Sequence, residues 1–151
     1  VYLDAGTTTV RMVEHLRQSK AIFVTNGVAC ALRLLDLGLR GYVLGGTLKP
    51  GTGAVVGADA LNALEGYNFT KAFLGINGIT VRQGFTTPDP EEAAVKRKAA
   101  QRAYLTYILA DSSKFETVTA ASVLPLEKAS IITDRLPDRA YLEHTIVKEV
   151  L

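Results

Sequence analysis

Short apolar runs alternate with helical stretches along the whole chain, and the connections between them are short. Seven runs have the length and composition of buried strands, at residues 1–3, 21–24, 41–44, 71–76, 105–110, 130–133 and 146–151. Between them the apolar spacing predicts helices at residues 7–18, 28–37, 58–64, 88–104 and 137–144. Such alternation is typical of an α/β fold. The sequence therefore predicts a Rossmann-like, mostly parallel sheet with helices on both faces.

The chain is expected to form one domain over residues 1–151. Its 151 residues, of which 48% are hydrophobic, are enough to bury a core. Residues 80–87 fit a loop or an irregular hairpin, which predicts a small irregular lobe around residues 78–90. The chain starts directly in a predicted strand, so we also expect a further domain upstream of it.

Charge and cysteine content narrow the possible partners. The net charge of +2 is too balanced to indicate a nucleic-acid surface. No apolar run approaches the ~18–20 residues of a membrane span, and no secretory signal opens the chain. Cys30 is the only cysteine and lies in an apolar helical run, which predicts a buried structural thiol. We expect a cytoplasmic protein with no membrane partner.

Two helices carry clear local signals. The helix at 28–37 is apolar on nearly every side, which predicts burial between layers, and Gly38 is suited to end it. In the helix at 88–104, Asp89 fits the N-cap and Pro90 the first helical position. Glu92 stands where a capping box needs an acidic residue.

Small, polar and flexible residues follow most of the predicted strands. Ligands of open α/β sheets bind outside the carboxyl ends of the strands, so these residues are candidates for a binding site. They suit a phosphorylated polar ligand. The candidates at the strand ends are Asp4, Gly6, Thr7, Thr8, Thr9, Asn26, Gly45, Gly46, Asn77, Gly78 and Lys114.

The turn from Gly6 to Thr9 permits two interpretations. The first N–H groups of a helix have no intrahelical partner and attract anions, and the three threonines add hydroxyl donors. Alternatively, Thr7 simply caps the helix, and the other two threonines are surface residues. The turn matches neither a Walker loop nor a GxGxxG pattern, so both interpretations stay open.

Other candidates also have structural explanations. Asn26 and Asn77 each precede a glycine and fit turn positions. Lys96 stands four residues after Glu92, as in an exposed ion pair on a helix, and Lys114 fits a solvated loop lysine.

The histidines and the cysteine of the sequence offer no candidate for catalysis or metal binding. His15 lies on the polar face of a predicted helix and His144 near the C-terminal end, so neither is a good candidate base. No Cys/His cluster has zinc spacing, and no Ser–His–Asp set is recognisable. We predict no catalytic residue, no metal and no cofactor.

Seven short motifs together resemble a known family. LDAGTTT, VTN, LGG, AFLGINGI, GFTTPDPEEAAVKR, LADSSKF and IITD occur in the order seen in the sensor domain of DeoR-type bacterial transcription regulators. The resemblance implies a fold similar to ribose-5-phosphate isomerase and the CoA transferases. It implies a phosphorylated sugar or related metabolite as effector, and a homo-dimer or homo-tetramer. It also implies operator DNA bound by an N-terminal winged helix-turn-helix that this chain lacks.

The resemblance also implies roles for residues in the matching motifs. Gly6, Thr7, Thr8 and Thr9 correspond to a phosphate cradle. Polar contacts to the sugar are implied for Asp4, Asn26, Asn77 and Lys96, with Lys114 as a second cation.

We therefore expect the effector-sensing domain of a transcriptional repressor of sugar metabolism genes, and not an enzyme. One alternative is a sugar-phosphate isomerase or deaminase on the same fold, with Asp89, Glu91 or Glu92 as the base. Another is a structural oligomerisation domain with a degenerate pocket.

Overall fold

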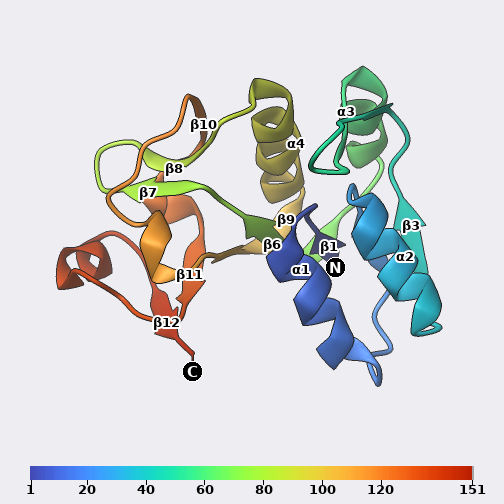
Figure 1. Ribbon diagram of the computed structural model, residues 1–151, viewed down its shortest axis with the longest axis horizontal. Helices are drawn as coiled ribbons and strands as arrows, with labels where there is room; N and C mark the ends of the chain where they lie inside the picture. The colour runs from blue at the N-terminus through green and yellow to red at the C-terminus, as the bar shows by residue number, and fades with distance from the viewer. Residues whose placement is uncertain (151) are drawn as a thin grey trace.

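The computed structural model describes residues 1–150, and within this range a seven-stranded parallel sheet forms the centre of the molecule (Figure 1). The strand order is β12-β11-β9-β6-β1-β2-β3, and every neighbouring pair is parallel. The predicted parallel α/β sheet is confirmed. Of the last predicted strand, residue 151 lies outside the described residues. The strands are β1 (Tyr2–Leu3), β2 (Phe23–Thr25), β3 (Gly41–Val43), β6 (Phe69–Gly75), β9 (Ala103–Leu109), β11 (Ser130–Thr133) and β12 (Val147–Glu149).

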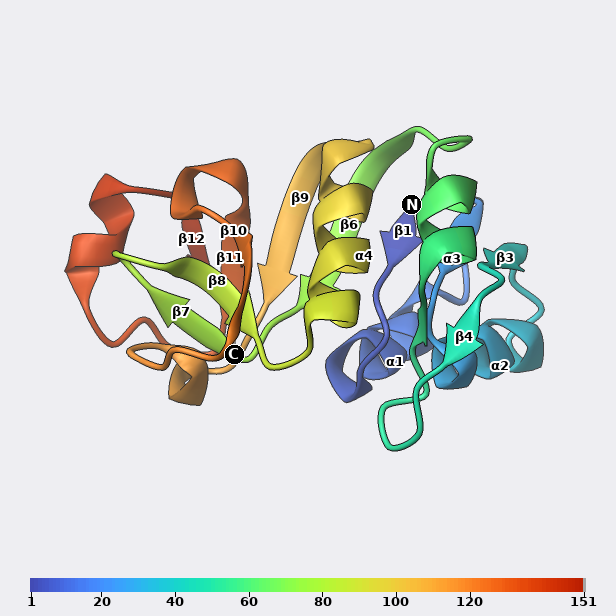
Figure 2. The same ribbon diagram turned by 90° about the horizontal axis from the view of Figure 1, so that it is seen from above.

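Helices cover both faces of the sheet, as predicted (Figures 1 and 2). Because side chains alternate along a strand, Tyr2 and Leu3 of β1 join different hydrophobic clusters. Leu3 packs with α1 and α2, whereas Tyr2 belongs to the larger cluster that includes α3 and α4. The helices are α1 (Thr7–Val13), α2 (Val28–Asp36), α3 (Ala58–Leu64) and α4 (Pro90–Gln101).

Two smaller sheets and four 3₁₀ helices complete the described chain. The predicted lobe contains an antiparallel sheet in the order β10-β8-β7, and the glycine-rich segment after β3 forms an unpredicted hairpin, β4–β5. The sheet elements are β4 (Thr47–Leu48), β5 (Val55–Val56), β7 (Gly78–Thr80), β8 (Gly84–Thr87) and β10 (Ala121–Leu124). The 3₁₀ helices are η1 (Glu14–Leu16), η2 (Ser112–Lys114), η3 (Leu126–Lys128) and η4 (Arg139–Glu143).

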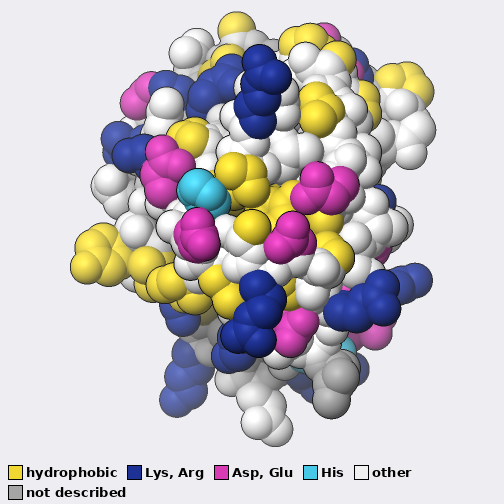
Figure 3. Space-filling model, turned by 90° about the vertical axis from the view of Figure 1, so that its left-hand side faces the viewer, with side chains coloured by type: hydrophobic (Ala, Val, Ile, Leu, Met, Phe, Trp, Pro, Cys, Tyr) yellow, Lys and Arg dark blue, Asp and Glu magenta, His cyan; other side chains and the backbone are white. Residues whose placement is uncertain are grey.

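Figure 3 shows the side of the molecule that carries the small lobe and η4. Basic and acidic side chains are scattered there around a group of hydrophobic ones, without a continuous basic field. Gly78 of the lobe serves packing: a Cβ at this position would stand 2.3 Å from the Thr117 carbonyl oxygen. No helix within residues 1–150 combines the length and the hydropathy of a membrane span.

Helix α2 differs from its prediction. Cys30 and Leu34 are buried as expected, and burial raises the pKa of the Cys30 thiol. The opposite side is open, with Val28, Leu32 and Leu35 37%, 58% and 73% exposed. The prediction of burial on every side was wrong because α2 packs beside β3, the edge strand, and no further layer covers it. Gly38 ends the helix with a left-handed φ of 65°, as predicted.

The N-terminus of α4 is capped by Asp89, as predicted. Its carboxylate accepts hydrogen bonds from the N–H groups of Glu91 (2.8 Å) and Glu92 (3.1 Å) and pairs with Lys49 on the β4–β5 hairpin. The predicted capping box was wrong, because the Glu92 carboxylate instead accepts a 2.8 Å hydrogen bond from the Thr52 hydroxyl. The hydrogen bond to Lys49 is the main reason why the pKa of Asp89 is lowered.

Two replacements of Asp89 separate its contribution to stability as a helix cap from the contribution of its negative charge. Asp89→Ala is expected to destabilise the fold by about 1 kcal/mol, because the cap is lost, whereas Asp89→Asn keeps the cap. The loss in the free energy of unfolding that Asp89→Asn causes, relative to the wild type, should be largest at neutral pH. It should shrink below the ordinary pKa of 3.8 and vanish below the lowered pKa, because only ionised Asp89 pairs with Lys49. Urea unfolding between pH 7 and pH 3 measures this, and a pH-independent deficit would contradict it.

Candidate functional site

A cavity of about 640 Å³ lies at the carboxyl ends of β1, β6 and β9. Its walls come from the turn into α1, the first turn of α2, the tip of the β4–β5 hairpin, α4 and η2. This volume lies within the range of small-molecule sites, and the location is the one where open α/β sheets bind ligands. The polar side chains that line it are Thr7, Thr8, Thr9, Arg11, Thr52, Asn77, Thr87, Glu92, Lys96, Asp111 and Lys114.

A buried ion pair stands beside this cavity. Lys96 reaches from α4 to the carboxylate of Asp4, and the two residues are 7% and 1% exposed. Asp4 also accepts a 3.0 Å hydrogen bond from the Gly75 N–H, and Lys96 donates to the Gly75 carbonyl at 3.1 Å. The ends of β1 and β6 are thereby joined to α4. The exposed Glu92–Lys96 pair considered from the sequence is replaced by this buried contact.

The side chain of Asn26 makes three hydrogen bonds within the protein. Its Oδ1 accepts hydrogen bonds from the Tyr2 hydroxyl (2.9 Å) and the Ala5 N–H (3.0 Å), and its amide donates to the Val55 carbonyl (3.1 Å). Burial, with the Asp4 charge nearby, raises the pKa of Tyr2 well above its ordinary value, so the hydroxyl stays a donor. Asn26 therefore joins β1, β2 and β5 and does not line the cavity.

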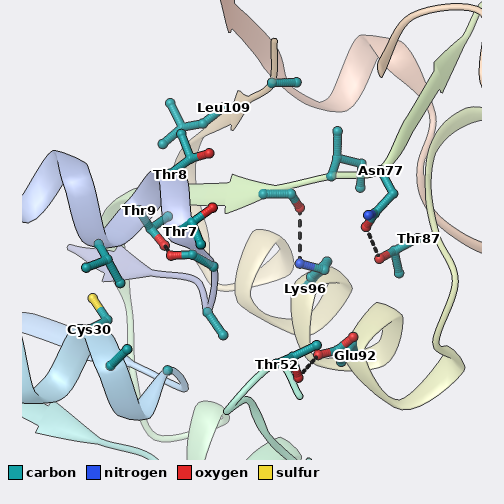
Figure 4. Close-up of a pocket in the computed structure, with 18 of the residues that line it drawn as sticks. Thr7, Thr8, Thr9, Cys30, Thr52, Asn77, Thr87, Glu92, Lys96 and Leu109 are labelled. Atoms are coloured by element: carbon teal, nitrogen blue, oxygen red, sulfur yellow. Dashed lines mark hydrogen bonds between the residues drawn. The ribbon is translucent and has the colours of Figure 1, made fainter. Parts of the chain in front are cut away.

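The three threonines after β1 are not equivalent. Gly6, and not Thr7, is the N-cap of α1, with a φ of 149°. The Thr9 hydroxyl is buried and donates to the carbonyls of Asp4 (2.6 Å) and Gly6 (2.9 Å). Thr7 and Thr8 are exposed on the cavity wall. Figure 4 shows them across the cavity from Asn77 and Thr87, with Lys96 between the two walls.

The remaining walls combine hydrogen-bonded loops with charged side chains. Asn77 accepts a 2.8 Å hydrogen bond from the Thr87 hydroxyl through its side-chain oxygen, so its side-chain NH₂ group is not used in this contact. Lys114, at the end of η2, follows Asp111, whose carboxylate accepts hydrogen bonds from the Ser113 hydroxyl and N–H. The hydroxyl bond is the main reason why the pKa of Asp111 is lowered.

Seven of the twelve candidate residues line the cavity: Gly6, Thr7, Thr8, Thr9, Asn77, Lys96 and Lys114. Asp4 and Asn26 lie behind its wall, and Gly45, Gly46 and Gly78 lie elsewhere. Gly46 serves close packing, since a Cβ there would stand 2.5 Å from the Val56 carbonyl oxygen. Both histidines are exposed away from the cavity. Within residues 1–150, no three His, Cys, Asp or Glu side chains come together as metal ligands would.

The candidate set omits five polar residues of the cavity. Arg11 lies inside the predicted helix at residues 7–18, beyond the turn considered for anion binding. Asp111 follows the end of β9 after one residue, so its place near a strand end was an available signal. Thr87 and Glu92 stand in the motif GFTTPDPEEAAVKR, which had been assigned to a loop and a helix cap. Thr52 comes from the unpredicted hairpin, and no local pattern points to it.

Comparison with known proteins identifies the domain type. The family described as the DeoR C terminal sensor domain matches residues 1–135. A Bacillus subtilis protein, "Uncharacterized HTH-type transcriptional regulator FruR", is 44% identical over 99% of this chain and 61% of its own length. The B. subtilis "HTH-type transcriptional repressor GlcR" is 34% identical, over 95% of this chain and 56% of its own length. The chain thus spans less than two thirds of the length of these relatives.

Solved structures share the fold at low sequence identity. Ribose 5-phosphate isomerase A from Methanocaldococcus jannaschii superposes with a TM-score of 0.51 at 12% identity, over 76% of this chain and 45% of that one. The ribose 5-phosphate isomerase from Plasmodium falciparum has a TM-score of 0.52 at 17% identity, over 77% of this chain and 44% of that one. The predicted similarity to the isomerase fold is confirmed.

Breaking the buried ion pair should destabilise the fold strongly. Lys96→Met and Asp4→Asn each leave a buried group without its partner and are expected to cost about 3–5 kcal/mol in the free energy of unfolding. The double variant should lose clearly less than the sum, because neither charge is then left alone. Urea unfolding measures all three variants. The control is Lys98→Met on the same helix, whose partner Glu65 is exposed and whose loss should matter far less. A loss of stability in the double variant equal to the sum of the two single losses would contradict an energetic coupling between Lys96 and Asp4.

Proposed function

The chain belongs to the DeoR C-terminal sensor domain family, and on that premise we propose that residues 1–151 form an effector-binding domain for a phosphorylated sugar or a related metabolite. The ligand would occupy the cavity at the carboxyl ends of β1, β6 and β9. In the full-length protein, its binding would modulate the binding of DNA.

One observation carries this proposal. Two lysines and two exposed threonine hydroxyls line a single cavity from different elements. Figure 4 shows Lys96 on α4 and Thr7 and Thr8 on α1, and Lys114 lines the cavity from η2. Lysine ammonium groups and hydroxyl donors match phosphate oxygens, and hydrogen bonds to charged groups contribute about 1.5–3 kcal/mol each. Such a set supports a compact, anionic and hydroxylated ligand.

The cavity also supports a division of roles among its residues. We assign the phosphate to the wall of Gly6, Thr7 and Thr8, with Lys114 as the accompanying cation. Lys96 and Asn77 are assigned to the sugar hydroxyls. Asp4 and Asn26 would act from behind this wall, because the protein itself uses their polar groups. Thr9 lines the cavity, but its hydroxyl is used within the turn into α1. Gly45, Gly46 and Gly78 receive no direct role in binding.

The proposal for the whole protein extends beyond this chain. It places a winged helix-turn-helix before Val1, operator DNA as the partner of that domain, and a homo-dimer or homo-tetramer in the cytoplasm. The names of the relatives, which contain the words "HTH-type transcriptional", support this assignment. The effector would bias the arrangement of subunits, and thereby the register of two DNA-binding domains with two half-sites.

A catalytic role on the same fold is not favoured. Asp89 is held by Lys49 and caps α4, and Glu91 does not line the cavity. Glu92 does line it, and its carboxylate is hydrogen-bonded to Thr52. We propose that the domain is not an enzyme. An assay of turnover with pentose and hexose monophosphates tests this point, and clear catalysis would overturn it.

Replacing two hydroxyls should weaken binding without unfolding the domain. The variant Thr7→Val with Thr8→Val is expected to bind sugar phosphates at least tenfold more weakly, because two donors to the phosphate are lost. Thermal-shift screening of pentose and hexose monophosphates finds a ligand, and isothermal titration calorimetry then gives its affinity.

Two controls make this result specific. Thr70→Val changes an exposed threonine of β6 that does not line the cavity, and it should leave affinity unchanged. The unphosphorylated sugar should give no stabilisation. Unchanged affinity in the double variant would remove the phosphate wall from the proposal, and no response of the wild type to the whole panel would favour a degenerate pocket.

A further inference from the structure

Glu92 introduces a negative charge into a cavity that is otherwise suited to anions. It lies on α4 one turn before Lys96 and is partly buried at the cavity wall. A phosphate beside this carboxylate would be repelled, whereas a hydroxyl group would donate a hydrogen bond to it. Figure 4 places Glu92 on the side of the cavity away from Thr7 and Thr8.

The other carboxylate of the cavity uses one of its oxygens, Oδ1, to hold its own loop. Asp111 accepts the N–H and the hydroxyl of Ser113 and so caps η2. Within residues 1–150 the carboxylate of Glu92 accepts one hydrogen bond, from the Thr52 hydroxyl at 2.8 Å. Because an ionised carboxylate has about four acceptor positions, Glu92 can still accept hydrogen bonds from a ligand.

Thr52 holds Glu92 from the tip of the β4–β5 hairpin. It lies between Gly51 and Gly53, which have left-handed φ values of 90° and 64°, with open space around both. The base of the tip is secured by backbone hydrogen bonds from Gly53 to Lys49 (3.0 Å) and from Val28 to Gly53 (3.0 Å). The Thr52 side chain therefore connects a secured hairpin to the carboxylate and restricts where that carboxylate lies.

We propose that Glu92 is the specificity-determining residue for the hydroxylated part of the ligand and that Thr52 is its positioning residue. This inference rests on the proposed function, since it assumes a phosphorylated ligand in the same cavity. Glu92 accepts hydrogen bonds from the ligand's hydroxyls and, by repulsion, orients the phosphate toward the opposite wall. The cavity thereby distinguishes a polyol phosphate from phosphate alone.

Glu92→Gln is the direct test, because it removes the charge and keeps the shape. The probes are inorganic phosphate and the sugar phosphates that stabilise the wild-type protein, titrated by calorimetry. The variant should bind the sugar phosphate about tenfold more weakly, since the hydroxyls lose a charged acceptor. Its affinity for inorganic phosphate should stay equal or rise. Glu91→Gln is the matched control: it removes the same charge one residue away, outside the cavity, and should change neither affinity.

Thr52 gives an independent variant for the same proposal. Thr52→Val should weaken binding of the sugar phosphate about threefold and leave inorganic phosphate unchanged, because only the orientation of Glu92 is lost. Thr52→Ser keeps the hydroxyl and should restore the affinity of the wild type. A purely structural role of the hairpin would lower both affinities together and would not depend on the hydroxyl.

The outcomes separate this inference from the proposed function. If the wild-type protein binds no phosphorylated probe, both fail. If it binds them and Glu92→Gln weakens sugar phosphate and inorganic phosphate equally, or neither, the role of Glu92 is overturned while the effector site stands. Selective loss for the sugar phosphate, with rescue by Thr52→Ser, supports it.

Discussion

The buried ion pair between Lys96 and Asp4 is the contact on which the site depends. A lysine and an aspartate that are 7% and 1% exposed can remain charged only when each is close to the other and hydrogen-bonded. The Gly75 backbone completes this arrangement, with its N–H on Asp4 and its carbonyl on Lys96. The ends of β1 and β6 and the first half of α4 are thus fixed relative to one another at the cavity.

This constraint leaves other polar groups available. Because Asp4 and Asn26 hold the strand ends, and because the Thr9 hydroxyl closes the turn into α1, the hydroxyls of Thr7 and Thr8 are not needed by the protein. Polar groups near the cavity therefore fall into two sets. Those of Asp4 and Asn26 are used by the fold, whereas the hydroxyls of Thr7 and Thr8 are exposed on the cavity wall.

The sequence predicts the elements whose causes are local. The alternation of apolar runs predicts the parallel sheet, α3 is found at its predicted limits, and Asp89 caps α4 as expected. Failures occur where distant contacts decide. The open stripe of α2 depends on β3 being the edge strand, and the partner of Glu92 comes from a hairpin 40 residues away. The separation of Asn26 from the cavity likewise depends on Val55.

The same distinction limits what a motif can say about a site. LDAGTTT contains Asp4, Thr8 and Thr9 within six residues, yet the first supports Lys96, the second faces the cavity and the third closes a turn. This motif thus contains residues that build the wall of the cavity together with a residue whose side chain lines it. Only the three-dimensional hydrogen-bond pattern separates them. For Glu92 that pattern shows a carboxylate oriented by the hydroxyl of Thr52, a contact between two segments that no single motif contains.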